Sequence, residues 1–388
     1  MFATIQSELQ RATGDIESAR GLPNPCYTDP DALLAERDGV FSTGWAGIGY
    51  EKDVPRAGDA TPITFLGVPL LMVRGRDNQV RVFQNTCRHR GMVLVDEPTH
   101  LKGVIRCPYH SWCYALDGSL KATPHVGGPG HNTHDAISPK DTGLIAFRTT
   151  VWLGVVFVNL SGDAPPFEDY CGDLTTRWRE FDRPLYHAGP DSSFTLDVNT
   201  NWKLAVENYC ESYHLPWIHP ALNSYSRLED HYNILSQGHY AGQGTRVYRP
   251  TLSEDGRQFD DFDDLDTMWS AGAEYITVFP NVMLGVHRDH TFAIVLEPIS
   301  QSRTREHIEI FYASERSAGP DMADLRQTNT TMWKTVFEED IGVCEGMQRG
   351  RAGPRFDGGV FSPVMDNATH CFHQWVAGRY LAHADRTA

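Results

Sequence analysis

Residues 87–110 read CRHRGMVLVDEPTHLKGVIRCPYH, and this stretch constrains the fold of the first half of the chain. It holds two Cys-His pairs: one residue separates Cys87 from His89, and two residues separate Cys107 from His110. Such short spacings let both members of a pair reach one centre from a single tight turn. The segment between the pairs is long enough to bring the second turn beside the first. The sequence therefore predicts two loops that clamp a metal centre.

Two kinds of metal centre use these four ligands. A structural zinc site takes two Cys and two His, but zinc fingers usually pair Cys with Cys and His with His. Here each loop supplies one of each, which favours two metal ions, with both thiolates on one iron and both imidazoles on the other. That ligation is typical of a Rieske [2Fe–2S] cluster. A zinc centre is the alternative.

The residues around these loops have the pattern of a small β domain. Short apolar runs such as ITFLGVPLLMVRG and VWLGVVFVNL alternate with turn residues, so we expect a β domain over 44–160. A helical lead-in is expected over 1–43, packed on the second domain. The segment SGDAPPFED, with its Pro-Pro pair, predicts a linker at the start of that second domain, 161–388. There, strand-like runs lie between helical stretches, so the expected fold class is α+β.

The composition restricts the classes of function. With 388 residues, 40% of them hydrophobic, the chain is long for one core and can bury two. A formal net charge of −16 disfavours binding to nucleic acid, whose binders concentrate Lys and Arg. Eight Cys are too sparse for a disulfide scaffold. The N-terminus lacks a continuous apolar segment, and no run of about 18 apolar residues occurs, so we expect a cytoplasmic protein without membrane contact.

A second set of possible metal ligands lies in NWKLAVENYCESYHLPWIHP, residues 201–220. At about 100° per residue, an apolar stripe forms from Trp202, Ala205, Val206, Tyr209 and Tyr213. The opposite side carries Glu207, Asn208, Glu211 and His214. One interpretation is an amphipathic helix with a solvated polar face. However, Pro216 cannot lie in a regular helix interior, so the chain must turn and can bring His214 and His219 to one ion.

A third ligand is expected from TNTTMWKTVFEEDIGVCEGMQRG, residues 328–350. Asp340 lies within the apolar stripe of this predicted helix, whereas Glu338, Glu339 and Glu345 are expected to point away. A carboxylate on a buried face is costly unless it has a partner. An iron ion held by His214, His219 and Asp340 would complete the 2-His-1-carboxylate triad of non-haem Fe(II) oxygenases. The alternative is an Asp paired with a buried Arg or Lys.

These motifs resemble those of the Rieske non-haem iron oxygenases. CRHRG followed by CPYHSWCYALDG is similar to the family's Rieske motif, and ENYCESYHLPWIH and EEDIGVCEGMQ are similar to its mononuclear-iron segments. The resemblance spans about residues 44 to 350. It implies a terminal oxygenase (alpha) subunit with a Rieske domain and a helix-grip-like catalytic domain, an antiparallel sheet with helices.

The resemblance also implies roles for individual residues. Cys87 and Cys107 would hold one iron of the [2Fe–2S] cluster and His89 and His110 the other, while the mononuclear Fe(II) would bind to His214, His219 and Asp340. In the family, an acidic residue at the position of Glu211 carries electrons between subunits of a homotrimer. Glu211 would thus link His110 of one chain to His214 of another.

The expected reaction uses O2 and electrons from elsewhere. No GxGxxG motif opens a βαβ unit and no flavin signature is visible, so a separate NAD(P)H-dependent reductase, with flavin or iron–sulfur groups, is expected. The motifs look closest to the family branch that hydroxylates or N-demethylates quaternary ammonium compounds such as choline, glycine betaine, carnitine and stachydrine. This favours a monooxygenase over a dioxygenase. We expect the substrate pocket to be lined by Tyr275, Phe279 and Asn281.

Other functions compete with this one. Within the enzyme class, the alternative is a ring-hydroxylating oxygenase that acts on an aromatic acid. Outside it, the cluster motif alone would suit an electron-transfer module, and zinc at the same ligands would suit an interaction protein. The second iron motif argues against the electron-transfer module.

Overall fold

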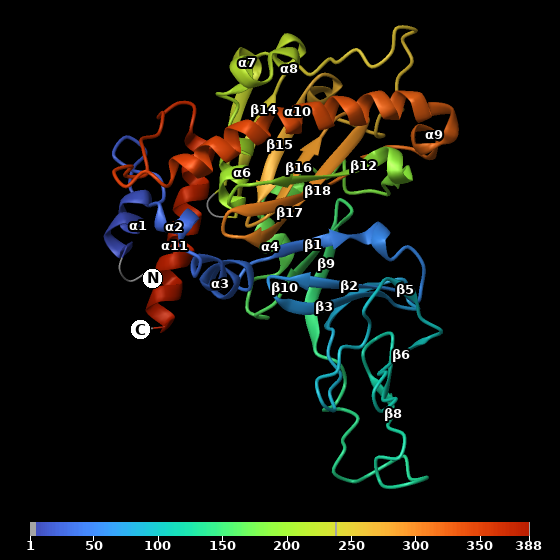
Figure 1. Ribbon diagram of the computed structural model, residues 1–388. Helices are drawn as coiled ribbons and strands as arrows, with labels where there is room; N and C mark the ends of the chain where they lie inside the picture. The colour runs from blue at the N-terminus through green and yellow to red at the C-terminus, as the bar shows by residue number, and fades with distance from the viewer. Residues whose placement is uncertain (1–4, 237–238, 388) are drawn as a thin grey trace. The chain divides into compact units, whose positions relative to one another are not determined.

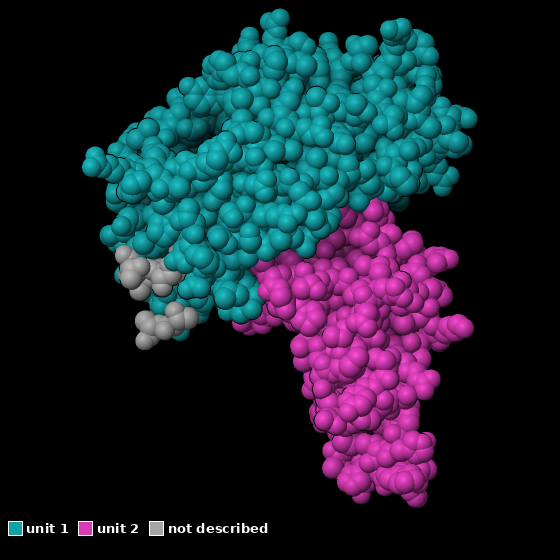
Figure 2. All heavy atoms as spheres, in the orientation of Figure 1, with its two compact units in different colours: residues 1–47, 164–388 teal, residues 48–163 magenta. Residues whose placement is uncertain are grey.

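The computed structural model describes residues 5–236 and 239–387 (Figure 1). The chain divides into two compact units, Ile48–Asp163 on the one hand and Met1–Gly47 with Ala164–Ala388 on the other (Figure 2). The N-terminal segment is thus grouped with the C-terminal part of the chain. Among the described helices, none is both long and apolar enough to cross a membrane.

The first unit is built from β-strands. A seven-stranded sheet has the order β1-β10-β9-β4-β3-β2-β5, and its pairings from β10 to β5 are antiparallel. Its strands are β1 (Ala46–Tyr50), β2 (Asp59–Phe65), β3 (Val68–Arg74), β4 (Val80–Gln84), β5 (Thr99–His100), β9 (Ala146–Trp152) and β10 (Val155–Asn159). A second sheet contains β6 (Val104–Arg106), β7 (Cys113–Ala115) and β8 (Leu120–Ala122). The expectation of a β domain is confirmed.

The second unit contains an antiparallel sheet of eight strands. Its order is β11-β18-β17-β16-β15-β14-β13, and β12 also pairs with β18. The strands are β11 (Tyr186–His187), β12 (Ser193–Val198), β13 (His231–Leu235), β14 (Tyr240–Thr245), β15 (Ala273–Val278), β16 (Val282–Val286), β17 (His290–Ser300) and β18 (Arg303–Tyr312). The order follows the chain closely, so hairpins build most of the sheet.

Helices pack on this sheet. Helices α6 (Trp202–Tyr209) and α10 (Ala323–Gly350) contact each other and the sheet, and α10 runs across the strands in Figure 1. The other described α-helices are α1 (Gln6–Ala12), α2 (Pro25–Thr28), α3 (Ala32–Glu36), α4 (Phe167–Cys171), α5 (Leu174–Arg177), α7 (Leu215–Ile218), α8 (Pro220–Tyr225), α9 (Glu315–Ala318) and α11 (Asn367–Thr387). The α+β fold class, with an antiparallel sheet and helices, is confirmed.

Helix α6 differs from its prediction. It ends at Tyr209, so Tyr213 lies outside it and is 45% exposed. The alternative interpretation, a solvated polar face, is wrong at Glu207 and Asn208, which are buried. The N-terminal segment and α11 cover this side and bring polar partners: Glu207 accepts a hydrogen bond from the Tyr27 hydroxyl and lies 3.3 Å from Nε2 of His373. Helical periodicity cannot show such cover, since it comes from segments far away in the sequence.

Candidate metal centres and substrate cavity

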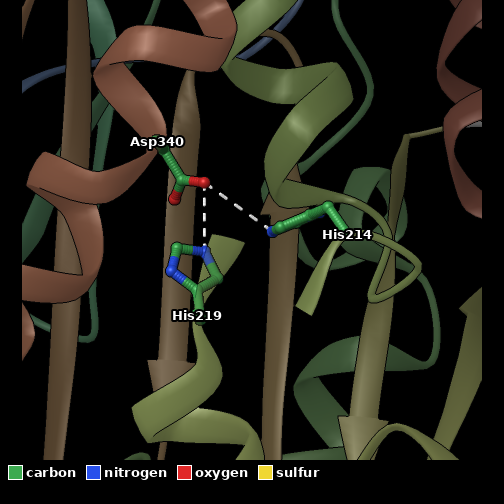
Figure 3. Close-up of side chains that lie close together, drawn as sticks. All are labelled: His214, His219 and Asp340. Carbon is green, nitrogen blue, oxygen red and sulfur yellow. Dashed lines mark ion pairs between the residues drawn. The ribbon is translucent and has the colours of Figure 1, made fainter. Parts of the chain in front are cut away.

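His214, His219 and Asp340 converge on one point in the second unit (Figure 3). Oδ1 of Asp340 lies 3.0 Å from Nε2 of His219 and 3.7 Å from Nε2 of His214. The three ligand atoms lie within 4.8 Å of one another. Ligands at about 2.1 Å from a first-row divalent ion, with angles near 90°, are separated by about 3 Å. The donor set therefore fits an iron ion after small adjustments.

Short helical turns position the two imidazoles. His214 precedes α7, and His219 lies between α7 and α8. Pro216 and Pro220 occupy the first turns of these helices, where the missing N–H of proline costs no hydrogen bond. The two prolines thus start new helices and return His219 to the side of His214. Asp340 comes from the middle of the long helix α10.

Carboxylates orient both imidazoles. Oε1 of Glu211 lies 2.6 Å from Nδ1 of His214, and its other oxygen accepts hydrogen bonds from the backbone N–H groups of Tyr213 and His214. Oε2 of Glu339 lies 2.7 Å from Nδ1 of His219. Each contact uses Nδ1 and leaves Nε2 for a metal, which is the usual carboxylate–histidine–metal arrangement.

The position of Glu339 corrects a prediction. The helical stripe placed Glu339 away from Asp340, yet it contacts the same imidazole as Asp340 does. The physical reason is that His219 presents two nitrogens on opposite edges, so neighbouring residues of α10 can reach one each. Glu338 and Glu345 do lie elsewhere: Glu338 is near Lys334, and Glu345 accepts hydrogen bonds from Asn199.

The electrostatics of this site suit a cation. Burial lowers the pKa of His219, but the hydrogen bonds and charges of Asp340 and Glu339 outweigh burial, and the net shift is upward. The carboxylates around His219 therefore stabilise a positive charge at this site, and a metal ion supplies that charge when it displaces the imidazole proton. Asn208 donates a hydrogen bond of 3.3 Å to Oδ1 of Asp340. Behind Asp340, burial and the charge of Asp340 raise the pKa of Glu306 to about 8.

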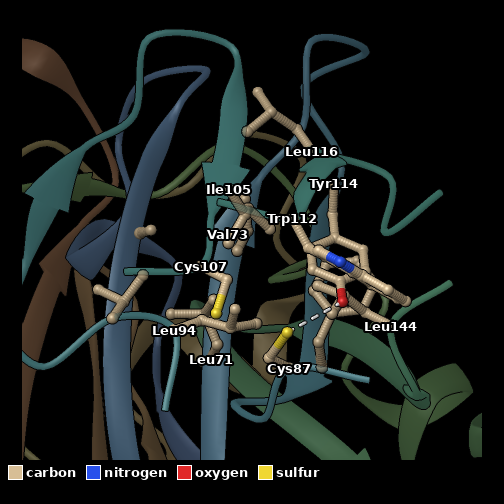
Figure 4. Close-up of a cluster of buried hydrophobic side chains, with 13 residues drawn as sticks. Leu71, Val73, Cys87, Leu94, Ile105, Cys107, Trp112, Tyr114, Leu116 and Leu144 are labelled. Atoms are coloured by element: carbon tan, nitrogen blue, oxygen red, sulfur yellow. Dashed lines mark hydrogen bonds between the residues drawn. The ribbon is translucent and has the colours of Figure 1, made fainter. Parts of the chain in front are cut away.

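In the first unit, the four predicted cluster ligands separate into thiols and imidazoles. Cys87 and Cys107 are buried in one apolar cluster, where Figure 4 shows both sulfur atoms. The rings of His89 and His110 have centroids 4.7 Å apart, and the side chain of His89 is exposed. Burial raises the pKa of Cys107, so the thiolate needs a metal for its stabilisation. This donor set fits a cluster with two unlike irons.

Two aromatic residues that the spacing did not predict contact these ligands. The hydroxyl of Tyr114 lies 3.3 Å from Sγ of Cys87 and accepts a hydrogen bond from the backbone N–H of Arg88 (Figure 4). Trp112 stacks on His89 with a centroid distance of 4.8 Å and an angle of 7°. Both residues lie in the quoted segment CPYHSWCYALDG, so their proximity to the second Cys-His pair was the available signal.

A cavity of about 480 Å³ opens beside His214, His219 and Asp340. This volume includes space that is open to solvent. Its walls are mostly apolar: Tyr209, Leu215, Leu222, Tyr275, Phe292, Trp333, Val336 and Phe337. Among the described residues that line it, none is Lys or Arg.

Of the three residues expected to line the pocket, one lines the cavity and two do not. Tyr275 lines the cavity. Phe279 does not, because it packs against Phe372 and Trp375. Asn281 does not either: its amide bridges the backbone of Gly47 and Leu296. Both residues lie beyond Val278, the last residue of β15, where strand alternation no longer sets the direction of a side chain.

Comparison with known families matches both units. Residues 44–134 match the Rieske [2Fe-2S] domain, and residues 185–382 match the ring hydroxylating alpha subunit (catalytic domain), which covers just over half of the chain. The chain belongs to the ring-hydroxylating alpha subunit family. The resemblance inferred from the motifs is confirmed. The protein is a Rieske oxygenase and uses a [2Fe–2S] cluster and a mononuclear iron.

Individual relatives share a quarter of the sequence. The chain is 26% identical over 340 residues to the carnitine monooxygenase oxygenase subunit of Escherichia coli (strain K12), covering 86% of this chain and 85% of that protein. It is 26% identical over 372 residues to the chloroplastic choline monooxygenase of Atriplex hortensis, covering 93% of this chain and 78% of that protein.

Solved structures share the fold. The quaternary ammonium Rieske monooxygenase CntA in complex with L-carnitine aligns with a TM-score of 0.74 at 22% identity, over 97% of this chain and 98% of that chain. Naphthalene 1,2-dioxygenase from Rhodococcus sp. bound to indole aligns with the same TM-score at 19% identity, over the whole of both chains. Since both align equally well, the fold alone does not distinguish between their substrates.

Proposed function

We propose that this chain is the terminal oxygenase component that hydroxylates or N-demethylates a small quaternary ammonium compound. Oxygenases of this family take electrons from a separate reductase. An NAD(P)H-dependent reductase with flavin or iron–sulfur groups is the expected donor, and the cytoplasm is the proposed location. The observation that carries the substrate class is the aromatic cavity beside the three convergent ligands.

The metal ligands are assigned from their geometry. Cys87 and Cys107 would hold one iron of the cluster, and His89 and His110 the other. His214, His219 and Asp340 would hold the mononuclear iron, with both Nε2 atoms and one carboxylate oxygen as donors. The support is the grouping of thiols with thiols and imidazoles with imidazoles, and the short distances around Asp340.

The cavity favours a cation over an anion. Tyr275, Phe292 and Trp333 line it, and the faces of such rings attract a trimethylammonium group, with tryptophan the strongest of the three. The described lining residues include no Lys or Arg to pair with a carboxylate, which disfavours an aromatic acid and equally the carboxylate of carnitine, glycine betaine or stachydrine, but not choline. The named relatives that act on carnitine and choline agree with this choice.

Bound at these residues, the cluster would pass single electrons and the mononuclear iron would activate O2 at an open coordination position. The aromatic walls would turn one N-methyl group towards His214, His219 and Asp340, and apolar residues such as Leu215, Leu222 and Val336 would exclude water. One oxygen atom enters a C–H bond of that methyl group. The other leaves as water with two electrons and two protons. The resulting N-hydroxymethyl group loses the proton of its hydroxyl to solvent as its C–N bond breaks, which gives the tertiary amine and formaldehyde.

Glu211 is proposed as the electron bridge between subunits of a homotrimer. Its carboxylate holds His214, and its side chain is 14% exposed, so one edge faces solvent. Beside it, Tyr213 and Trp217 are 45% and 68% exposed, which is unusual for large aromatic side chains and typical of an interface. A neighbouring chain that covers them could place its His110 against Glu211.

A substrate screen with a surrogate reductase tests the proposed function. Choline, glycine betaine, carnitine and stachydrine would be compared with benzoate and other aromatic acids, with formaldehyde and hydroxylated product as readouts. Turnover of at least one quaternary amine, coupled to O2 uptake, is expected. Turnover of aromatic acids alone would contradict the assignment and favour ring hydroxylation.

A further inference from the structure

Two buried histidines lie directly behind the aromatic wall of the cavity. The turn between β16 and β17 has the sequence VHRDH, and it places His287 and His290 with parallel rings, 4.3 Å between centroids and 5° between planes. Both side chains are almost completely buried, at 0% and 1% exposure. Neither residue lines the cavity or belongs to the ligand set described above.

The hydrogen bonds of His290 determine which of its ring nitrogens carries the proton. The indole N–H of Trp333 donates to Nε2 of His290 over 3.0 Å. Because Nε2 accepts this bond, it carries no proton, and the ring proton must lie on Nδ1. Nδ1 is 2.6 Å from Oδ1 of Asp289, to which it donates. His290 is therefore neutral, and its tautomer is set by Asp289 on one side and Trp333 on the other.

His287 serves the neighbouring wall residue. Its Nε2 lies 3.2 Å from the hydroxyl of Tyr275, while its Nδ1 has no hydrogen-bond partner among the described residues. Burial holds the pKa of His287 well below its usual range. The ring is thus neutral and fully enclosed, with Tyr248 and Trp333 at 4.6 and 5.0 Å between centroids.

These contacts bear on how the cavity can bind a cation. Trp333 and Tyr275 both line it, and each has its polar atom turned to one of the two imidazoles. The attraction between a cation and an aromatic ring depends on the position of the charge over the ring face. A fixed indole N–H determines the tilt of that face, and an N–H donated to a neutral acceptor leaves the ring more electron-rich.

We propose that His290, held by Asp289 and stacked on His287, is a positioning residue that fixes Trp333 for selective binding of a quaternary ammonium group. This inference rests on the proposed function, because it assumes that a cation occupies the cavity. A positioning role for His290 differs from a packing role in one measurable respect. Loss of the hydrogen bond should weaken the binding of a cation more than that of an uncharged ligand of the same shape.

The test compares choline with its uncharged isostere, 3,3-dimethylbutan-1-ol, by isothermal titration of the iron-loaded full-length protein. The wild type should bind choline at least about tenfold more tightly than the isostere, as a desolvated cation–π contact allows. His290→Leu should reduce this ratio by about threefold to tenfold, while the dissociation constant of the isostere changes little. His290→Gln keeps an acceptor near the position of Nε2 and should restore most of the ratio.

A second variant, in which Trp333 itself is replaced, separates the effect of the hydrogen bond from other effects of His290→Leu. Trp333→Phe keeps an aromatic face but has no N–H, so His290→Leu should have no additional effect on the ratio in that variant. If the wild type does not prefer choline to the isostere, the inference fails, and the proposed function fails with it only if the substrate screen also finds no turnover of a quaternary amine. If the wild type prefers choline and His290→Leu keeps the full ratio, or weakens both ligands equally, the inference alone is overturned.

Discussion

Glu339 and His219 are joined through the nitrogen that faces away from the proposed iron, with 2.7 Å between Oε2 and Nδ1. The adjacent residue, Asp340, contacts the other nitrogen of the same ring at 3.0 Å. One turn of α10 thus provides both Asp340, a candidate ligand of the iron, and Glu339, which orients the second candidate ligand, His219. His214 has the same arrangement through Glu211.

The Glu339→Ala variant should bind iron more weakly at the mononuclear site. Loss of a carboxylate that orients a ligand histidine typically costs 10-fold to 100-fold in metal affinity. Iron content after dialysis against a chelator measures this loss. Glu338→Ala is the matched control, since Glu338 lies one residue earlier and only approaches exposed Lys334 at 3.7 Å. Equal iron retention in the two variants would exclude the orienting role.

The Asp340→Ala variant should lose the mononuclear iron and keep the cluster. Its carboxylate lies next to both imidazoles, and without it a two-histidine site lacks the third donor. Metal analysis should show about one iron fewer per chain, with an unchanged visible spectrum of the cluster. Full iron content with normal turnover would mean that another carboxylate completes the site, for example that of the buried Glu306, which lines a cavity together with Asp340.

The Glu211→Gln variant should keep both metal centres but slow electron transfer. An amide retains the shape of the side chain and its contact with His214, but it removes the negative charge. Stopped-flow spectroscopy should show slower reoxidation of the reduced cluster in the presence of substrate and O2. A rate equal to that of the wild type would dismiss the bridge between subunits.

The Tyr114→Phe variant should lower the reduction potential of the cluster. The hydroxyl 3.3 Å from Sγ of Cys87 stabilises the electron-rich reduced form, and hydrogen bonds to sulfur raise the potential. A hydrogen bond worth about 1 kcal/mol corresponds to some tens of millivolts for one electron. An EPR-monitored redox titration measures the shift. Tyr109→Phe is the control, because Tyr109 is 56% exposed.

His239 should make the second unit sensitive to acid. Burial lowers its pKa to about 4, and Nδ1 accepts a hydrogen bond from Trp375 over 3.2 Å. The unfolded chain has the higher pKa, so this stabilisation is complete above about pH 6.5 and is lost as the pH falls towards 4. Because the ring is partly exposed, the loss should be about 1–2 kcal/mol.

A titration-free variant tests the role of His239. His239→Asn keeps an acceptor near the position of Nδ1 but cannot be protonated. As the pH falls from 7 to 4.5, the apparent Tm of the wild type should decrease more than that of this variant. A constant difference over this range would show that His239 does not titrate as expected.

Local sequence patterns predict some features of this protein and not others. The Cys-His spacing in 87–110 predicts the two loops, because chain stiffness limits what nearby residues can reach. The apolar stripe around Asp340 predicts the direction in which the Asp340 side chain points, because α10 is long and regular. Glu339 could not be predicted, since its partner His219 comes from a distant turn. Likewise, Phe279 and Asn281 lie beyond the end of β15, where alternation no longer indicates the face.

A single-turnover experiment tests most directly whether one chain couples two iron centres to oxidation of a quaternary amine. The protein is reduced chemically without any reductase, freed of reductant, and mixed with O2 in the presence or absence of the amine found in the screen. The cluster should reoxidise quickly only when the amine is present, with up to one product molecule formed per mononuclear iron. Reoxidation at the same rate with and without the amine, and no product, would contradict the proposed function.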